Sequence, residues 1–415
     1  MHYKYPRADE FKDVPRPDFH AHSGNLILYG AGVNGLIASV LLKKMGVEFI
    51  CFADSDEKKW GTKYMDKPVI SPQELKEKYT DVAVMVTPYT LRPVYKMLRE
   101  MGYTILFDCL HLFLEFDTED VEPLLPKERY LPGQFIIAIN SYMRKLTEFH
   151  LFGFGGYKAL TIFLTEKCTL RCKDCLNFIP FYKSPKDCDF EILSKTLDRL
   201  LRIDRYAHVT IEGGEIFLYN HLPEIINKLI SSENINFIYP ITNGTILPDM
   251  SVLNNFKNEK VVVRISDYGD KSIKMEELSS LFKKEKVTFN ITKQQWYRLD
   301  FNKFNRSDNE NQIIFNNCCK SEGPIYVFHG KLYRCAFAAH LERLGIIAIS
   351  NEDSVDLSAE LFDDAELNKK INELYTRDKF IKACCYCRGR SYLGVKIPIA
   401  EQAIGELPPL PRFTE

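Results

Sequence analysis

The chain has 415 residues, of which 45% are hydrophobic and 27% are charged. This length and composition are typical of a globular protein of two or three domains, and they exclude a disordered or fibrous chain. The 55 Lys and Arg residues nearly cancel the 56 Asp and Glu residues. The balance gives no electrostatic reason to expect a nucleic acid or an anionic membrane as the partner.

The first residues, 1–24, are expected to form a tail. They carry charges and prolines where a signal peptide needs an apolar run. The longest apolar stretch, Asn25 to Leu42, contains three glycines and Asn34, which favours a strand, a turn and a helix over a membrane span. We therefore expect a cytoplasmic protein without a membrane partner, whose thiols stay reduced.

Residues 25–115 alternate strand and helix patterns. NLILY, VEFICFAD, DVAVMVT and TILFD are expected to be strands, and Ser71, Pro72 and Glu74 stand in capping-box register at the start of a helix. Such alternation predicts a Rossmann-like domain, a parallel sheet with helices on its faces. Residues 116–155 have no clean period and are expected to form a helical connector.

A glycine turn joins the first strand to the first helix. Gly30, Gly32 and Gly35 form G-x-G-x-x-G, and Asp54 ends the next strand about twenty residues on, as in a dinucleotide-binding fingerprint. The pattern predicts a nucleotide site; a domain that serves only for docking or oligomerisation is the alternative. The segment from Phe52 to Leu75 resembles Rossmann-like domains of enzymes of sugar modification and cell-surface glycan synthesis, and this resemblance implies a nucleotide-sugar ligand.

A second alternating series spans residues 156–300. KALTIFL, HVTIEGGE, NFIYPITNG, VVVRISDYG and VTFNIT are expected to be strands, and DFEILSKTLDRLLRI and HLPEIINKLIS place apolar residues at helical spacing. Five strands connected in this way predict an open sheet or a partial (βα) barrel. The pattern becomes irregular from about residue 300, and residues 401–415 are expected to form a proline-rich tail.

The twelve cysteines are unevenly distributed. Three are isolated, Cys51, Cys109 and Cys188, and each is expected to be a small buried apolar residue. Nine lie in three tight groups, which are Cys168, Cys172 and Cys175; Cys318, Cys319 and Cys335; and Cys384, Cys385 and Cys387. In a reducing compartment such groups indicate metal ligation rather than disulfides.

The first group lies in one short loop, TEKCTLRCKDC, directly after a predicted strand. Cysteines at i, i+4 and i+7 can turn toward one inorganic centre, and thiolate is the usual ligand of iron–sulfur clusters. Four thiolates complete a cluster, so three leave one metal position open to another ligand. A zinc knuckle that only staples the loop is the alternative.

This CxxxCxxC loop resembles the signature of the radical SAM superfamily. The resemblance implies that Cys168, Cys172 and Cys175 hold a catalytic [4Fe-4S] cluster whose open iron binds S-adenosylmethionine. In that family an electron from a donor such as flavodoxin or ferredoxin splits the cofactor, and the resulting 5′-deoxyadenosyl radical abstracts hydrogen from the substrate. The residue before the third cysteine is often aromatic in the family but is Asp174 here, which puts the packing around the adenine in doubt and leaves ligation untouched.

Further motifs end the later predicted strands in order. The resemblance implies that they bind S-adenosylmethionine, and they are Gly213, Gly214, Glu215, Thr242, Asn243 and Ser266. Glycines let the backbone approach a ligand closely, and a carboxylate suits an ammonium partner. Because ligands of α/β folds sit at the carboxyl ends of strands, the motifs predict one site.

The remaining cysteines resemble the auxiliary-cluster extension of radical SAM enzymes called SPASM or, in its shorter form, twitch. This resemblance rests on C-x10-G-x4-C and a later CxxC, and it implies a small irregular α+β domain over residues 301–400 with a second [4Fe-4S] cluster. Its ligands would be Cys319, Cys335, Cys384 and Cys387. Cys318 and Cys385 could replace their neighbours, and a structural zinc site is the alternative.

Three functions are compatible with these patterns. The first is a radical SAM enzyme that oxidises or epimerises a carbohydrate or nucleotide-linked small molecule, with the auxiliary cluster transferring electrons. The second keeps this chemistry but acts on a peptide or protein. The third is a non-catalytic nucleotide-binding module stapled by zinc. The sequence singles out no residue as the hydrogen donor or base.

Overall fold

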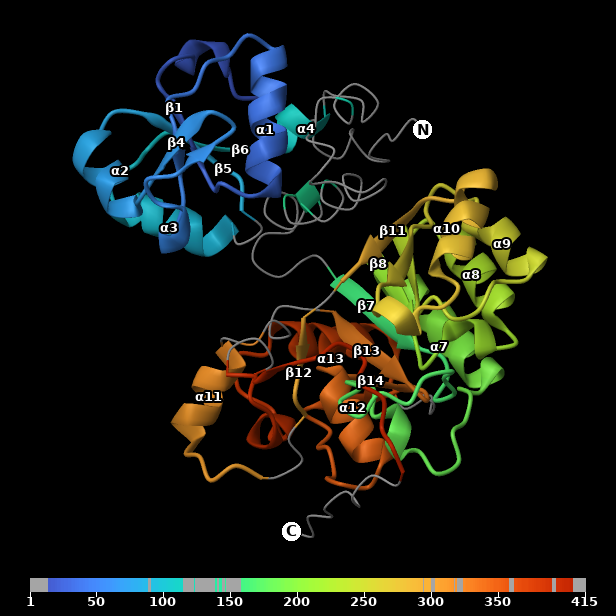
Figure 1. Cartoon of the computed structure of the whole chain (residues 1–415). Coiled ribbons are helices and arrows are strands. Elements are labelled where there is room, and N and C mark those ends of the chain that lie inside the picture. The colour runs from blue at the N-terminus through green and yellow to red at the C-terminus, as the bar shows by residue number, and fades with distance from the viewer. Residues whose placement is uncertain are drawn as a thin grey trace. The chain divides into compact units, whose positions relative to one another are not determined.

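The structure is a computed structural model that describes residues 14–88, 91–114, 123, 139, 142–143, 146, 158–293, 295–299, 303–316, 318, 324–357, 362–389 and 393–405. The chain divides into two compact units, Met1–Tyr157 and Lys158–Glu415, each with its own hydrophobic core (Figure 1). None of the helices in these ranges combines the length and the apolar character that crossing a membrane requires.

The first unit is a six-stranded sheet in the order β3-β4-β2-β1-β5-β6. Its strands are β1 (Leu26–Tyr29), β2 (Phe52–Ala53), β3 (Lys63–Tyr64), β4 (Lys67–Ile70), β5 (Ala83–Val86) and β6 (Leu106–Asp108). Its helices are α1 (Val33–Lys44), α2 (Pro72–Lys78), α3 (Leu91–Glu100) and α4 (Leu110–Leu114), with short 3-10 helices η2 (His20–His22) and η3 (Glu57–Lys59). Only β3 runs antiparallel to its neighbour, so the predicted parallel sheet is confirmed.

Local sequence explains these elements. Every residue of β1 and β5 is buried, as expected for central strands of a parallel sheet covered on both faces. Ser71 caps α2 as predicted, because its hydroxyl oxygen accepts a 3.0 Å hydrogen bond from the Glu74 N–H. Helix α1 packs against β1 and α4, and α3 packs against β5 (Figure 1).

The second unit is built on an eight-stranded sheet in the order β11-β10-β9-β8-β7-β13-β14-β15. These strands are β7 (Lys158–Phe163), β8 (Tyr206–Glu212), β9 (Ile235–Thr242), β10 (Val263–Ser266), β11 (Phe289–Thr292), β13 (Ile325–Phe328), β14 (Lys331–Tyr333) and β15 (Ser354–Asp356); a separate pair is β12 (Trp296–Tyr297) with β16 (Lys396–Ile397). Strands β7 to β11 are parallel and follow chain order, as the alternating sequence pattern predicts.

Helices connect these strands (Figure 1). They are α7 (Phe190–Ile203), α8 (Leu222–Ser231), α9 (Met250–Phe256), α10 (Met275–Lys284), α11 (Asp308–Asn316), α12 (Ala336–Arg343) and α13 (Asp364–Thr376), with 3-10 helices η6 (Ile179–Phe181), η7 (Ile216–Leu218), η8 (Gly269–Lys271) and η9 (Lys382–Tyr386). The two helices predicted from apolar spacing are α7 and α8, and their buried residues are apolar apart from Thr196 in α7.

The C-terminal part of the chain extends the sheet of the central part. Strand β13 pairs in parallel with β7, with Ile325 opposite Leu160, and β14 and β15 then continue the sheet antiparallel. The cysteine-rich region after residue 300 therefore shares one sheet and one compact unit with the predicted radical SAM core. These strands have only three or four residues, too few for an alternating pattern to identify them from the sequence.

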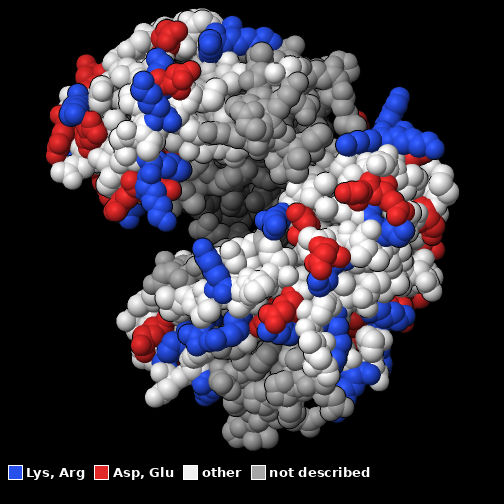
Figure 2. Space-filling model, in the orientation of Figure 1, with Lys and Arg blue, Asp and Glu red and all other residues white. Residues whose placement is uncertain are grey.

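The three isolated cysteines are buried as predicted. Cys51 and Cys109 have no exposed area and Cys188 has 4%. On the face shown in Figure 2, Lys and Arg side chains lie interspersed with Asp and Glu side chains over the described surface of both units.

Candidate metal centre

The first cysteine loop leaves the carboxyl end of β7 and is held at both ends. Thr165 and Asp187 form an isolated antiparallel bridge, and the Glu166 N–H donates to the carbonyl of Lys186 over 2.9 Å. The Glu166 side chain has no exposed area and forms a 2.8 Å ion pair with Arg343. Between these ties, the Cys175 N–H donates to the Cys172 carbonyl over 3.1 Å, which turns the loop back on itself.

Cysteine sulfurs in the loop accept hydrogen bonds from nitrogen donors. Cys168 Sγ accepts from the Leu170 N–H at 3.4 Å and from Asn243 Nδ2 at 3.5 Å, and Cys172 Sγ accepts from Gln402 Nε2 at 3.2 Å. N–H donors stabilise the negative charge of a metal-bound thiolate. The loop therefore offers its sulfurs the surroundings that a thiolate needs.

Cys172 is buried, Cys168 and Cys175 are half-buried, and the three thiols lie within electrostatic reach of one another. Burial raises the pKa of Cys168 and Cys175 to about 12 and that of Cys172 to about 11, and the charge of a neighbouring loop cysteine raises each further. Metal binding must therefore displace protons from these thiols. Because a metal cluster supplies the compensating positive charge, its binding removes the cost of mutually repelling thiolates.

Gly213 and Gly214 let the end of β8 touch the cysteine loop. The Gly214 N–H donates to the Thr165 carbonyl over 2.7 Å, and the Glu215 N–H donates to the Lys167 carbonyl over 2.9 Å. A Cβ added to Gly214 would lie 2.1 Å from the Lys167 oxygen. The glycines thus allow backbone-to-backbone contact beneath the first cysteine.

The carboxylate of Glu215 ties the end of β8 to the end of β9. Its oxygens accept hydrogen bonds from the Thr242 hydroxyl at 2.9 and 3.0 Å and from the Asn243 N–H at 2.9 Å. The residue has no exposed area. Burial raises the pKa of Glu215 to about 7, and these hydrogen bonds act in the opposite direction. The carboxylate is thus a tie between two strand ends.

The pKa of Glu215 predicts a pH-dependent stability. Because burial raises it above the ordinary 4.5, the folded chain binds this proton more tightly than the unfolded chain, and the stabilisation present below about pH 4.5 is lost as the pH rises through about 7. Glu215→Gln does not titrate. We expect wild type to lose about 1–2 kcal/mol of unfolding free energy relative to Glu215→Gln between about pH 5.5 and about pH 8. Urea denaturation at the two pH values measures the unfolding free energy of both proteins. A difference in unfolding free energy between them that does not change with pH contradicts the prediction.

The predicted cofactor residues meet at one edge of the sheet. Asn243 reaches from the end of β9 to Cys168 and donates to the Thr169 hydroxyl at 3.1 Å. Ser266 at the end of β10 is buried, and its carbonyl accepts from the Ser272 hydroxyl at 2.9 Å. The Tyr268 side chain follows, within electrostatic reach of all three loop cysteines. Their contacts with S-adenosylmethionine remain predictions.

The C-terminal cysteines form a second group around α12 and η9. Cys335 caps α12, and Cys384 and Cys387 lie in η9 and at its end. Burial raises the pKa of Cys384, and the charges of Cys335 and Cys387, which lie within electrostatic reach, raise it further. Arg334 lies within electrostatic reach of Cys335, Cys318 and Cys384. Cys319 lies outside the described residues.

The neighbouring Cys385 has a different environment. Burial raises its pKa, and the charges that act on it most strongly are those of Lys303 and Arg306, which lower it. Cys387 Sγ accepts a 3.3 Å hydrogen bond from the Gly389 N–H.

Within the described ranges, no three His, Cys, Asp or Glu side chains are arranged to hold a single metal ion. A cluster distributes its thiolates over several irons, so its ligands need not meet at one point. In both cysteine groups, soft sulfur ligands that accept hydrogen bonds from N–H groups fit an iron–sulfur cluster.

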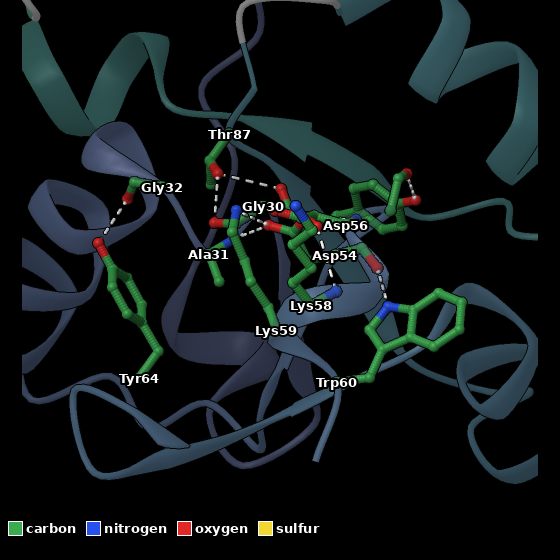
Figure 3. A network of polar contacts seen from close by, with 12 residues as sticks. Gly30, Ala31, Gly32, Asp54, Asp56, Lys58, Lys59, Trp60, Tyr64 and Thr87 are labelled. Carbon is green, nitrogen blue, oxygen red and sulfur yellow. Dashed lines mark hydrogen bonds and ion pairs between the residues drawn. The ribbon is translucent and has the colours of Figure 1, made fainter. Parts of the chain in front are cut away.

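The glycine turn of the first unit is closed by Asp54 (Figure 3). One carboxylate oxygen accepts from the Ala31 N–H at 2.7 Å and pairs with Lys59 Nζ at 2.9 Å, and the other accepts from the Asp56 N–H at 2.9 Å. Both oxygens are therefore engaged within the protein. The predicted contact of Asp54 with a ribose would have to compete with these bonds.

The three glycines have different surroundings. A Cβ on Gly35 would lie 2.0 Å from the Gly30 oxygen, and one on Gly30 would lie 2.5 Å from the Thr87 hydroxyl. The close turn is therefore possible only because neither residue has a side chain. Nothing lies within 4 Å of a Cβ on Gly32, although Tyr64 donates a 3.0 Å hydrogen bond to its carbonyl (Figure 3). The open space at the N-terminus of α1 therefore lies beside Gly32, the N-cap residue of this helix.

Known proteins resemble this chain to different extents. No protein-family model matches it. The GTP 3′,8-cyclase of Aquifex aeolicus (strain VF5) is 31% identical over 135 residues, which are 27% of this chain and 41% of the cyclase. The match therefore spans less than half of that relative.

Solved structures align over larger parts of the chain. AnSMEcpe with bound AdoMet is 17% identical and covers 56% of this chain and 88% of its own, with a TM-score of 0.37. BtrN in complex with AdoMet and 2-DOIA is 13% identical and covers 60% and 97%, with a TM-score of 0.37. SuiB of Streptococcus suis bound to S-adenosylmethionine is 17% identical and covers 40% and 41%, with a TM-score of 0.28. The cysteine loop, the strand-end motifs that meet it and the partial match to the cyclase agree with the resemblance to the radical SAM superfamily.

Proposed function

We propose that the chain is an enzyme in which Cys168, Cys172 and Cys175 hold a [4Fe-4S] cluster. When bound, the cluster supplies the electron that splits S-adenosylmethionine and so allows hydrogen abstraction from a substrate. The observation that carries the proposal is that three buried or half-buried thiols lie in one loop, with N–H donors directed at their sulfurs. Three thiolates leave one iron open to the cofactor.

The chain's own residues have distinct tasks in this proposal. The loop holds the thiolates, and Gly214 lets the end of β8 approach the loop without a side chain between them. Glu215 fixes the Thr242 and Asn243 groups that face the cofactor. Tyr268 packs edge-on against Trp296, with ring centroids 5.5 Å apart, and in this proposal the pair would lie beside the reacting centre.

The second cysteine group is proposed to hold an auxiliary [4Fe-4S] cluster. Its ligands would be Cys335, Cys384, Cys387 and either Cys319 or Cys318. Four thiolates leave no iron open, so this cluster would not bind S-adenosylmethionine. The role proposed for it is to accept an electron from a substrate radical, which favours net oxidation of the substrate; holding the irregular region together is the alternative.

Anaerobic purification tests the proposed activity. The protein is expected to contain iron and acid-labile sulfide, and after reduction it is expected to convert S-adenosylmethionine to 5′-deoxyadenosine. Zinc in place of iron at the cysteine loop would overturn the proposal. About eight irons per chain indicate both clusters, and about four indicate one.

A carbohydrate or nucleotide-linked small molecule is the proposed substrate class. Two observations support it. The first unit carries the glycine turn with open space at Gly32, and the cyclase relative is named for a nucleotide, GTP. Backbone N–H groups at the start of α1 suit a phosphate group there.

Substitution of Gly32 tests nucleotide binding. Its extended backbone accepts any residue and no atom lies near its Cβ, so Gly32→Val is expected to unfold at the wild-type temperature without ligand. A uridine diphosphate sugar is expected to stabilise the wild type, whereas the valine side chain weakens binding by about tenfold or more, or about 1.4 kcal/mol. Thermal unfolding with and without the sugar nucleotide measures both effects. Equal stabilisation of the two proteins would place the ligand elsewhere.

A further inference from the structure

The C-terminal residues 400–405 lie against the first cysteine loop. Cys172 and Gln402 form an isolated antiparallel bridge. The Lys173 N–H donates to the Glu401 carbonyl over 3.0 Å, and the Ala403 N–H donates to the Arg171 carbonyl over 2.7 Å. This segment, which we name the C-terminal strap, therefore pairs with the loop as a strand would, although the sequence predicted a tail from residue 401.

The preceding residues bring the strap to the loop. Strand β16 pairs antiparallel with β12, and the Arg298 N–H donates to the Val395 carbonyl over 2.9 Å. Ala400 has no exposed area and a φ of 51°, so the chain makes a fixed turn just before the strap. An ion pair of 2.7 Å between Lys173 and Glu401 adds a side-chain contact. The strap is thus attached to the loop at several points.

Gln402 bonds to the loop through both ends of its side-chain amide. Its oxygen accepts from the Arg171 N–H at 2.7 Å, and its nitrogen donates to Cys172 Sγ at 3.2 Å and to the Ala400 carbonyl at 2.7 Å. A flipped amide would set its nitrogen against the Arg171 N–H and its oxygen against the Ala400 oxygen. The contacts therefore fix the amide with its N–H groups toward the sulfur.

We propose that Gln402 is a positioning residue for the [4Fe-4S] cluster that stabilises its reduced state through Cys172. The inference rests on the proposed function of the loop. Reduction adds an electron, and the added negative charge is shared with the thiolate ligands. A donor to a ligand sulfur favours the more negative state and raises the reduction potential.

Redox titration of the holoenzyme tests this role. Gln402→Met keeps the length and the neutral charge but removes all three hydrogen bonds of the side-chain amide. We expect the equilibrium constant for one-electron reduction of the cluster to fall about tenfold, or about 59 mV, in a titration followed by electron paramagnetic resonance. The matched control is Ile404→Ala, in the same strap, because the Ile404 side chain is 96% exposed. Its potential is expected to equal that of the wild type.

The outcomes distinguish this inference from the proposed function. A wild type without an iron–sulfur signal overturns both. A Gln402→Met cluster with full iron and the wild-type potential overturns the inference alone. If Gln402→Met loses iron, Gln402→Asn decides, since it stays polar and neutral but is one methylene too short to reach the sulfur. A lowered reduction potential or a loss of iron in Gln402→Asn supports the role, provided that Ile404→Ala keeps the wild-type potential and iron content. A Gln402→Asn protein with the wild-type potential and iron content overturns it.

Discussion

Cys172→Ala is expected to abolish formation of 5′-deoxyadenosine. The variant leaves two thiolates in the loop, and it also removes the sulfur to which Gln402 donates. A cluster held by two thiolates exposes a second iron and is lost more easily. The product is therefore expected to fall below detection, and the iron content is expected to fall by about four per chain, as measured by chromatography of the reduced reaction and by iron assay.

Cys51→Ala is the matched control for this loss. Cys51 is also buried but lies in the core of the first unit, away from the three cysteine groups, so its substitution is expected to cost stability and leave product formation unchanged. Retention of full iron and activity by Cys172→Ala would show that Cys172 is not a ligand. Equal loss in Cys51→Ala would indicate a folding defect instead.

Gly214→Ala is expected to have the second largest effect. The added Cβ would lie 2.1 Å from the Lys167 oxygen and 2.8 Å from Cys168 Cβ, so the backbone of the cysteine loop must move. A displacement of about 1 Å at a reacting centre can cost about 100-fold in rate. We expect a loss of this size in 5′-deoxyadenosine formation, together with a lower iron content.

Gly32→Ala provides the control for a glycine-to-alanine change without a clash, because no atom lies within 4 Å of the added carbon. Circular dichroism is expected to give the same helix content for both variants and wild type. If Gly214→Ala loaded iron and turned over like wild type, close contact between β8 and the loop would not be required.

The sequence predicted the position of the cysteine loop, since a short loop after a strand keeps its cysteines together whatever surrounds them. It also predicted that Glu215 and Asn243 would end neighbouring strands. It did not predict that the Glu215 carboxylate faces inward, because whether a side chain at a strand end turns toward solvent or toward the next strand depends on packing.

Other features depend on distant parts of the chain. The bond between Gln402 and Cys172 joins residues 230 positions apart, and no periodic pattern marks it. The C-terminal strap, residues 400–405, has no alternating pattern that would mark it as a strand, and its bridge to the cysteine loop depends on the fold. Asp54 stands where the fingerprint predicts it, yet its oxygens are engaged by Ala31 and Lys59. Motif spacing fixes positions, whereas side-chain partners come from the fold.

The shared sheet sets the spacing between the two cysteine groups. The first group follows the carboxyl end of β7, whereas β14 runs antiparallel to β13 and carries Cys335 toward the level of Ala159. Ala159 and Phe163 are four positions apart in β7, which corresponds to roughly 13 Å along the strand. Because the first group and Cys335 both follow strands of one hydrogen-bonded sheet, the sheet would hold the two proposed redox centres apart, and electron tunnelling between them would occur over a fixed path.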